Sequence, residues 1–104
     1  MLYFMVTLKI KPGKIQEYLK QQQTHLPVLF EKFGIRLIGS WLTTVGEANE
    51  VVAIHGYRDF EHLQGFWNQQ AQDPELQEYT RTVSEYLDGA NTRIMAPTPY
   101  SPIK

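Results

Sequence analysis

The chain has 104 residues, 42% of them hydrophobic, which is enough for one domain with its own core and too short for two. The net charge is −1 with both signs scattered, so no basic stripe marks a nucleic-acid or anionic-lipid surface, and no apolar run approaches the roughly 20 residues of a membrane helix. The absence of cysteine excludes disulfides, thiolate metal sites and cysteine nucleophiles. It fits a reducing, cytoplasmic compartment.

The first half of the chain predicts a strand, a helix and a hairpin. Residues 2–10 carry apolar side chains at every second position, which is typical of a strand. Residues 14–33 carry them at i, i+3 and i+4, which predicts a helix with Gly34 as its C-terminal cap. Residues 35–45 and 50–57 predict two antiparallel strands joined by a short loop.

The second half begins with two helical segments. Residues 60–72 predict a helix whose N-cap is Asp59. Asp73 and Pro74 then start another helix, because aspartate caps well and proline is tolerated at the first helical position. We expect Gly89 to end it.

Residues 92–96 predict a short fourth strand, and the prolines that follow predict an extended C-terminal tail. The element order is β-α-β-β-α-β, with the second helix split. This order predicts an α+β, ferredoxin-like plait: a four-stranded antiparallel sheet with the helices on one face. We assign residues 1–97 to this domain and residues 98–104 to the tail.

Both predicted hairpin strands are apolar on both faces. In the first, Ile35, Leu37 and Trp41 fall on one face, while Ile38 and Leu42 fall on the other. Helices can cover only one face of such a sheet. The second apolar face therefore predicts a partner, and a second copy related by a two-fold axis is the simplest one. We expect a homodimer that forms through its sheet faces.

The five-residue connection suits an antiparallel hairpin, and one register of its strands is taken as a hypothesis, since a slip of one residue would change every pair. If Val45 pairs with Val51, Trp41 lies opposite His55 on one face of the sheet. Under this hypothesis both rings belong to one wall of a pocket between the sheet and the helices.

Several motifs along nearly the whole chain carry a family resemblance. They are Lys11-Pro12-Gly13-Lys14, Leu26-Pro27, Leu37 to Trp41 with Gly46 and Asn49, Val51-Val52, Tyr57, Asp73-Pro74-Glu75, and the proline-rich block from Arg93 to Pro102. In these motifs the chain resembles the NIPSNAP family, a branch of the dimeric α+β-barrel proteins. The resemblance implies a homodimer whose two sheets close a barrel with the helices outside.

The resemblance implies no particular reaction. Family members commonly read Val-His-Leu-Trp in the third strand, whereas this chain has Ala53 at the histidine position and His55 at the tryptophan position. A role of the family histidine therefore does not pass to His55. The wider superfamily includes cofactor-independent monooxygenases, haem-degrading enzymes and small isomerases, so whether this chain is an enzyme stays open.

The candidate pocket residues are polar or aromatic side chains of the first helix and the hairpin: Gln22, His25, Trp41, His55 and Tyr57. His55 lies among apolar residues, where an imidazole that titrates near neutral pH could act as a base; a half-buried histidine bonded to backbone is the alternative. Gln22 interrupts an apolar stripe and needs a partner. A ligand, the carbonyl freed by Pro27 and a strand side chain are the options.

The remaining expectations concern metals and function. His25, His55 and His62 lack the spacing that places two ligands on one helix face, so we expect no metal site and no cofactor, and we give His62 no role. A lone histidine as a haem ligand is the minor alternative. Three functions stay open: a cofactor-independent monooxygenase-like enzyme in which His55 deprotonates the substrate for reaction with oxygen, a small-ligand binder, and a non-catalytic protein-interaction module.

Overall fold

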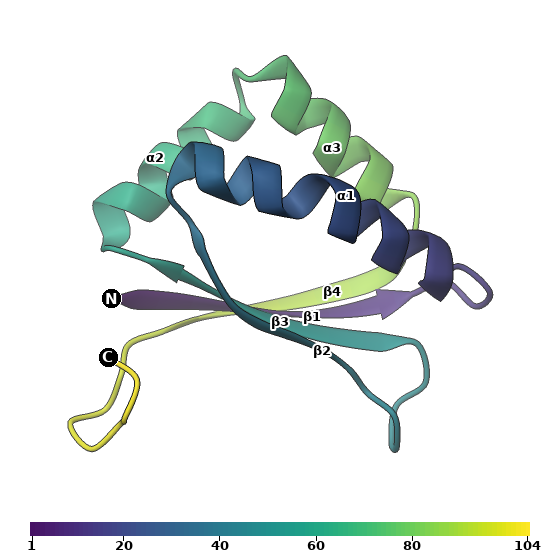
Figure 1. The fold of residues 1–104 in the computed structure, drawn as a ribbon, viewed down its shortest axis with the longest axis horizontal. Coiled ribbons are helices and arrows are strands. Elements are labelled where there is room, and N and C mark those ends of the chain that lie inside the picture. The colour runs from purple at the N-terminus through teal and green to yellow at the C-terminus, as the bar shows by residue number, and fades with distance from the viewer.

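The computed structural model describes residues 1–104 and contains seven elements of regular structure. They are β1 (Leu2–Ile10), α1 (Ile15–Phe33), β2 (Arg36–Leu42), β3 (Glu50–Tyr57), α2 (Phe60–Gln70), α3 (Pro74–Ser84) and β4 (Leu87–Met95). The strands form one antiparallel sheet in the order β2-β3-β1-β4, and all three helices lie on one side of it (Figure 1). The predicted ferredoxin-like fold is confirmed. No helix combines the length and the apolar content needed to cross a bilayer.

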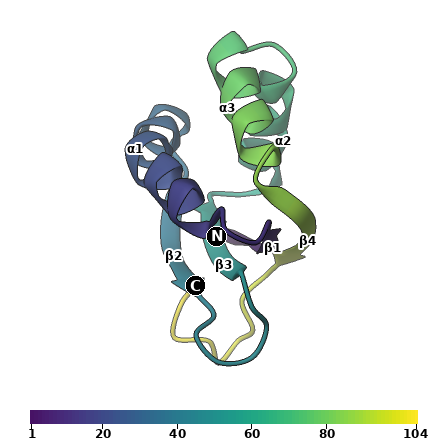
Figure 2. The same ribbon diagram turned by 90° about the vertical axis from the view of Figure 1, so that its right-hand side faces the viewer.

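The helices divide into two groups above the sheet. Figure 2 shows α1 on the β2 side, apart from α2 and α3, which lie side by side toward β4. The predicted caps are confirmed: Gly34 adopts φ 66°, in the left-handed region, after α1. Asp59 accepts a hydrogen bond from the His62 N–H at 2.8 Å, and Asp73 accepts one from the Glu75 N–H at 3.0 Å.

The predicted boundary between the last helix and the last strand is wrong. β4 begins at Leu87 rather than at residue 92, and Gly89 lies inside the strand instead of ending the helix. The whole length of β1 is available for pairing, and Leu87 pairs with Ile10 across an irregularity in the register. Backbone pairing along this edge outweighs the low strand propensity of the polar residues that open β4.

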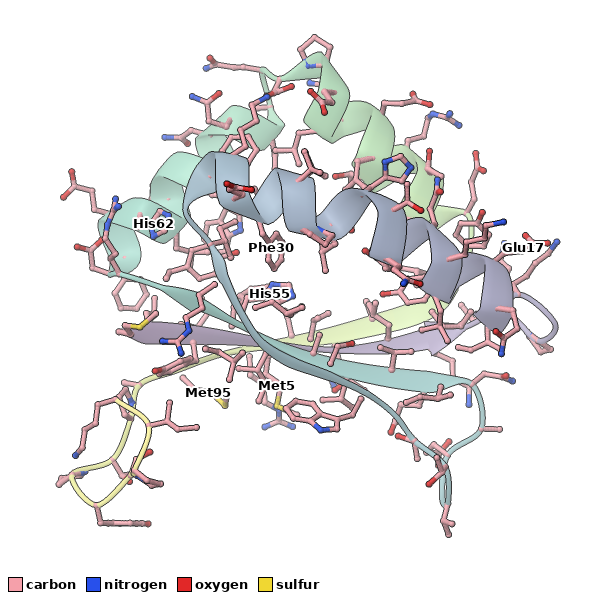
Figure 3. All side chains as sticks on the ribbon, in the orientation of Figure 1. Met5, Glu17, Phe30, His55, His62 and Met95 are labelled. Carbon is pink, nitrogen blue, oxygen red and sulfur yellow. The ribbon has the colours of Figure 1, made fainter.

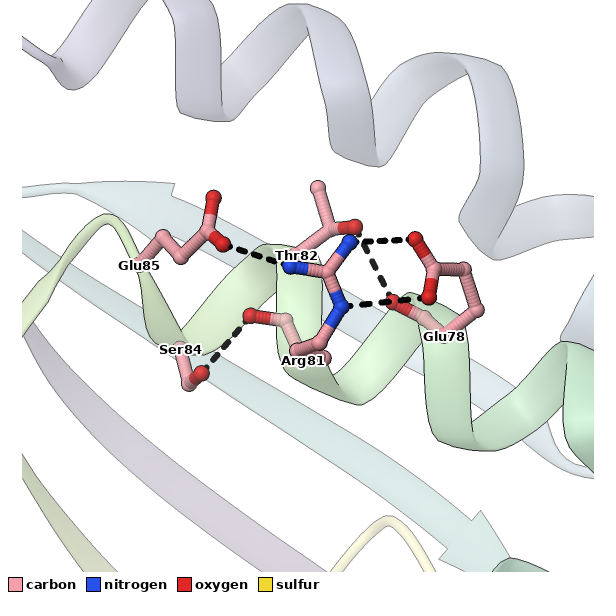
Figure 4. A network of polar contacts seen from close by, with 5 residues as sticks. All are labelled: Glu78, Arg81, Thr82, Ser84 and Glu85. Atoms are coloured by element: carbon pink, nitrogen blue, oxygen red, sulfur yellow. Dashed lines mark hydrogen bonds and ion pairs between the residues drawn. The ribbon is translucent and has the colours of Figure 1, made fainter.

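The end of α3 is closed by side chains of its last turn. Figure 4 shows the Ser84 hydroxyl donating to the Arg81 carbonyl at 2.7 Å and the Thr82 hydroxyl donating to the Glu78 carbonyl at 2.9 Å. The Arg81 guanidinium lies between Glu78 and Glu85 and bonds to both carboxylates. Backbone donors close the same turn: the Glu85 N–H donates to the Thr82 carbonyl at 3.3 Å and the Tyr86 N–H donates to the Val83 carbonyl at 3.0 Å.

The hairpin register proposed from the sequence is also wrong. β2 ends at Leu42, and Trp41 pairs with Val52 instead of lying opposite His55, whose partner is Leu37. The register shifts between Leu37 and Gly39, so one extra residue is accommodated there as a bulge. Because side chains alternate across a sheet, Trp41 and His55 point to opposite faces.

The C-terminal tail is not extended. The Ser101 N–H donates to the Thr98 carbonyl at 3.1 Å, and the Ser101 hydroxyl donates to the Ile103 carbonyl at 2.6 Å. The tail therefore folds back beside the sheet face that carries no helices (Figure 1). A hollow of about 310 Å³ lies between the tail and that face, with Tyr3 and Ile54 in its wall.

The core between the sheet and the helices has two parts. The first cluster is buried around Leu2, Phe30, Ile35, Tyr57 and Leu63. The second is buried around Leu8, Ile10, Tyr18 and Val51. Each part packs one end of the sheet against the helices.

Candidate functional site

A cavity of about 220 Å³ lies between the two core clusters, under α1 and α3. Its apolar wall comes from the helix-facing side of β1, from β3, and from both helices: Phe4, Val6, Leu8, Leu19, Leu26, Ala53 and Val83. Its polar groups are Tyr18, Gln22, Ser40, His55 and Tyr79. No aspartate, glutamate, lysine or arginine lines it.

The sequence accounts for the cavity. Ala53 and Ser40 are direct partners across β3 and β2 and are too small to fill the space between the sheet and α1. Gln22 occupies the position on α1 where the apolar stripe would otherwise place a core side chain. Small residues on the sheet and an amide on the helix thus leave a gap that the flanking clusters do not close.

His55 projects from β3 toward the helices, beneath Phe30 (Figure 3). Its ring is stacked on Phe4, with centroids 6.1 Å apart, and meets Phe30 edge-on at 4.7 Å. The ring nitrogens have no hydrogen-bond partner in the protein, and burial alone lowers the pKa of His55 to about 4. At neutral pH the side chain is therefore an uncharged imidazole with one unused donor and one unused acceptor.

Three polar side chains face His55 from the helices. The Tyr79 hydroxyl of α3 donates to Oε1 of Gln22 on α1, which joins the two helices across the cavity. Tyr18 lies one turn before Gln22, and burial raises its pKa to about 12, an effect that the Gln22 amide partly offsets. Burial and the neighbouring Tyr18 also raise the pKa of Tyr79. Both phenols are neutral at physiological pH, so the cavity carries no charge.

The structure brings together two of the five predicted pocket residues, Gln22 and His55. Trp41 lies on the opposite face of the sheet, 55% exposed, with its ring against the backbone of Gly39. Tyr57 is 2% exposed inside the first core cluster. His25 borders a separate depression of about 390 Å³ on the outside of α1 and α3.

Sequence reasoning missed Tyr18, Tyr79 and Ser40 as cavity residues. A signal for Tyr18 was present, because it precedes Gln22 by four residues and so shares its helix face. Tyr79 carried no such signal. Its position in an apolar stripe predicts core packing, and only the angle between α3 and α1 brings it to Gln22.

A larger hollow, about 750 Å³, lies where α1 ends and α2 begins. Its central imidazole is already in use: His62 Nδ1 accepts from the Arg58 N–H at 3.0 Å, and Nε2 donates to the Phe33 carbonyl at 2.7 Å. A carbonyl only accepts and an amide N–H only donates, so these partners define the tautomer. Because both nitrogens serve the fold, we place the candidate site in the smaller cavity around His55.

No group of three or more histidine or acidic side chains is arranged to hold a metal ion. The chemistry on offer is hydrogen bonding by a neutral imidazole, an amide and two phenols around an apolar space. Such a cavity suits recognition of a small molecule by shape and by one or two polar groups.

The NIPSNAP family model matches residues 3–102. The chain belongs to the NIPSNAP family. The resemblance seen in the sequence motifs is thereby confirmed. A crystal structure of an uncharacterized NIPSNAP domain protein from Burkholderia xenovorans is 30% identical, with a TM-score of 0.86 over 98% of this chain and 99% of that one.

Two further structures define the range of similarity. A NIPSNAP family protein from Agrobacterium tumefaciens is 26% identical, with a TM-score of 0.88 over 99% of this chain and 98% of that one. An antibiotic biosynthesis monooxygenase is 14% identical, with a TM-score of 0.71 over 95% of this chain and 100% of that one. At that identity the likeness concerns the fold alone. No curated protein matches the chain.

Proposed function

We propose that this NIPSNAP protein binds an uncharged small molecule in the cavity between the sheet and the helices. The observation that carries the proposal is His55: a half-buried, neutral imidazole with no protein hydrogen bond that faces an amide and two phenols across an apolar space. No fully buried side-chain nitrogen or oxygen of the chain lacks a hydrogen-bond partner, so the unpartnered nitrogens of His55 are open to the cavity rather than sealed in the core. A ligand that supplies a partner to His55 gains a hydrogen bond in surroundings of low polarity.

The same geometry favours ligand binding over base catalysis. Base catalysis by His55 is the step that a monooxygenase-like enzyme would need. With the pKa of His55 at about 4, taking a proton from a phenol of pKa about 10 is uphill by about six units, or about 8 kcal/mol. No cation lines the cavity to stabilise the anion that would result. His55 is therefore better suited to hydrogen-bond a ligand than to deprotonate it.

Native mass spectrometry of the purified protein tests the binding proposal by detecting a retained small molecule. The variant Ala53→Leu fills the cavity from β3 and should lose the ligand, whereas Val52→Leu, on the other face of the same strand, should keep it. Equal retention by both variants would place the ligand elsewhere. A protein that neither retains nor takes up any small molecule would favour the interaction-module alternative.

We further propose that two copies pair through the sheet face that carries no helices. Met5 and Met95 project from this face (Figure 3), and Trp41 adds an indole that is 55% exposed. A Cβ at Gly39 would lie 2.4 Å from the indole, so the glycine lets the ring lie flat on the strand. An apolar face of this kind is costly in water, and a second copy offers the matching surface. The cavity lies on the other side of the sheet and needs no partner.

Sedimentation equilibrium tests the dimer independently of the ligand. The protein should have twice the chain mass at micromolar concentration, and Trp41→Glu should reduce it to the monomer mass. Val45→Glu is the matched control, because Val45 is 92% exposed in the loop beyond β2. A wild-type monomer at that concentration would contradict the proposal.

A further inference from the structure

The size, charge and polar groups of the cavity restrict the kind of molecule it can hold. We propose that its ligand is an uncharged, single-ring aromatic compound whose hydroxyl group hydrogen-bonds to His55. This inference rests on the proposed binding function and names the chemical class of the ligand.

The volume sets the number of rings. An apolar protein cavity of about 150 Å³ holds one benzene molecule. The cavity here measures about 220 Å³, which leaves room for one ring with one or two small substituents. Phe4 and Leu26 in its wall offer flat and aliphatic surface to such a ring, and both pack on the first core cluster, which holds them in place.

The lining sets the charge. No acidic or basic side chain reaches the cavity, and its two phenols, Tyr18 and Tyr79, are neutral at physiological pH. A carboxylate or an ammonium ion would lose its hydration there without gaining a counter-ion. The ligand is therefore uncharged, and a phenolic hydroxyl meets this condition at neutral pH.

The polar groups on opposite walls set the functional group. On the sheet side, His55 has a free acceptor and a free donor. On the helix side, Oε1 of Gln22 is taken by Tyr79, which leaves the amide N–H groups to donate. A hydroxyl both donates and accepts, so it can satisfy the acceptor nitrogen of His55 while it accepts from Gln22. A methyl group of the same size satisfies neither and leaves the imidazole unpaired.

Titration calorimetry with p-cresol and p-xylene tests the inference, because the two probes differ by one hydroxyl in place of one methyl. We expect p-cresol to bind at least about tenfold more tightly, although p-xylene is the more hydrophobic of the two. Benzoate should not bind. In protein with ¹⁵N-labelled histidine, p-cresol should shift the ring nitrogen signals of His55 and leave those of His62 unchanged.

Two variants separate the possible outcomes. His55→Phe keeps an aromatic ring between Phe4 and Phe30 and should abolish the preference for p-cresol while p-xylene still binds. Ala53→Leu should abolish the binding of both probes. If p-xylene binds as tightly as p-cresol to the wild type, the cavity binds ligands but the hydroxyl assignment is wrong. If neither probe binds, the single-ring assignment is wrong, and native mass spectrometry decides separately whether the binding function stands.

Discussion

His55 of β3 and His62 of α2 come from adjacent elements of the chain, yet their surroundings are opposite. Both ring nitrogens of His62 are bonded to backbone, at Arg58 and Phe33, so the side chain ties the start of α2 to the end of α1. Its ring also meets Tyr57 edge-on, with centroids 5.3 Å apart. His55 has two aromatic neighbours and no hydrogen bond.

The difference shows how a histidine can be assigned a structural or a binding role. A ring whose donor and acceptor are both used by the protein holds two segments together and has nothing left for a ligand. A half-buried ring whose nitrogens are open to a cavity and have no protein partner keeps its donor and its acceptor available for a ligand. The larger hollow surrounds the structural histidine and the smaller cavity surrounds the unpaired one. Volume alone would therefore point to the wrong site.

The largest expected effect comes from removing the structural histidine. His62→Ala leaves the Phe33 carbonyl and the Arg58 N–H without their partners and removes the ring from Tyr57. We expect a loss of about 3 kcal/mol in the free energy of unfolding, measured by urea denaturation at a fixed protein concentration.

His25→Ala is the matched control for this measurement. His25 is exposed and forms no hydrogen bond through its ring, so its removal should change the free energy of unfolding by less than about 0.5 kcal/mol. Equal losses in the two variants would mean that the His62 bonds do not tie α1 to α2.

The second effect is a pH dependence that His55 alone should produce. Burial lowers its pKa from 6.5 to about 4, so between these values the unfolded chain binds a proton that the folded chain does not. Above pH 6.5 the neutral His55 ring costs the folded state nothing. As the pH falls from 6.5 toward 4, protonation of this residue in the unfolded chain lowers the free energy of unfolding. From pH 7 to pH 5 we expect a loss of about 2 kcal/mol from this residue.

His55→Phe isolates that contribution. The titratable groups that face His55 in the cavity, Tyr18 and Tyr79, stay neutral throughout this pH range. Other acid-sensitive groups act on both proteins, so the difference between the two unfolding curves reports His55. The free energy of unfolding of the variant should fall less between pH 7 and pH 5 than that of the wild type. If it falls by the same amount in both proteins, His55 is not desolvated.

The two histidines also show how far the sequence predicts this molecule. Element order, caps and the helix-covered face follow from local patterns around residues such as Asp59, Gly34 and Asp73, because capping and side-chain alternation act over a few residues. Gln22 was detectable as a polar group in an apolar stripe. These features need no knowledge of distant parts of the chain.

The rest depends on contacts between distant segments. A single bulge between Leu37 and Gly39 moves Trp41 to the face opposite His55, and nothing in the hairpin sequence distinguishes that register from its neighbours. β4 exists as a long strand because β1 offers an unpaired edge, not because residues 88–91 favour extended structure. One backbone partner of His62 is the carbonyl of Phe33, and no local sequence pattern connects these two residues.

The smallest expected effect concerns the pair of side chains that faces His55. Tyr79→Phe removes the hydroxyl that bonds to Gln22 and should cost about 1 kcal/mol in the free energy of unfolding, since a partly buried amide oxygen then loses its partner. Tyr100→Phe, at a residue that is 86% exposed, should cost nothing measurable.

In the double variant Tyr79→Phe with Gln22→Leu, no amide is left unpaired, so its loss should be smaller than the sum of the two single losses. Strictly additive losses would show that the two side chains do not interact, and the helix side of the cavity would then present two independent polar groups to a ligand.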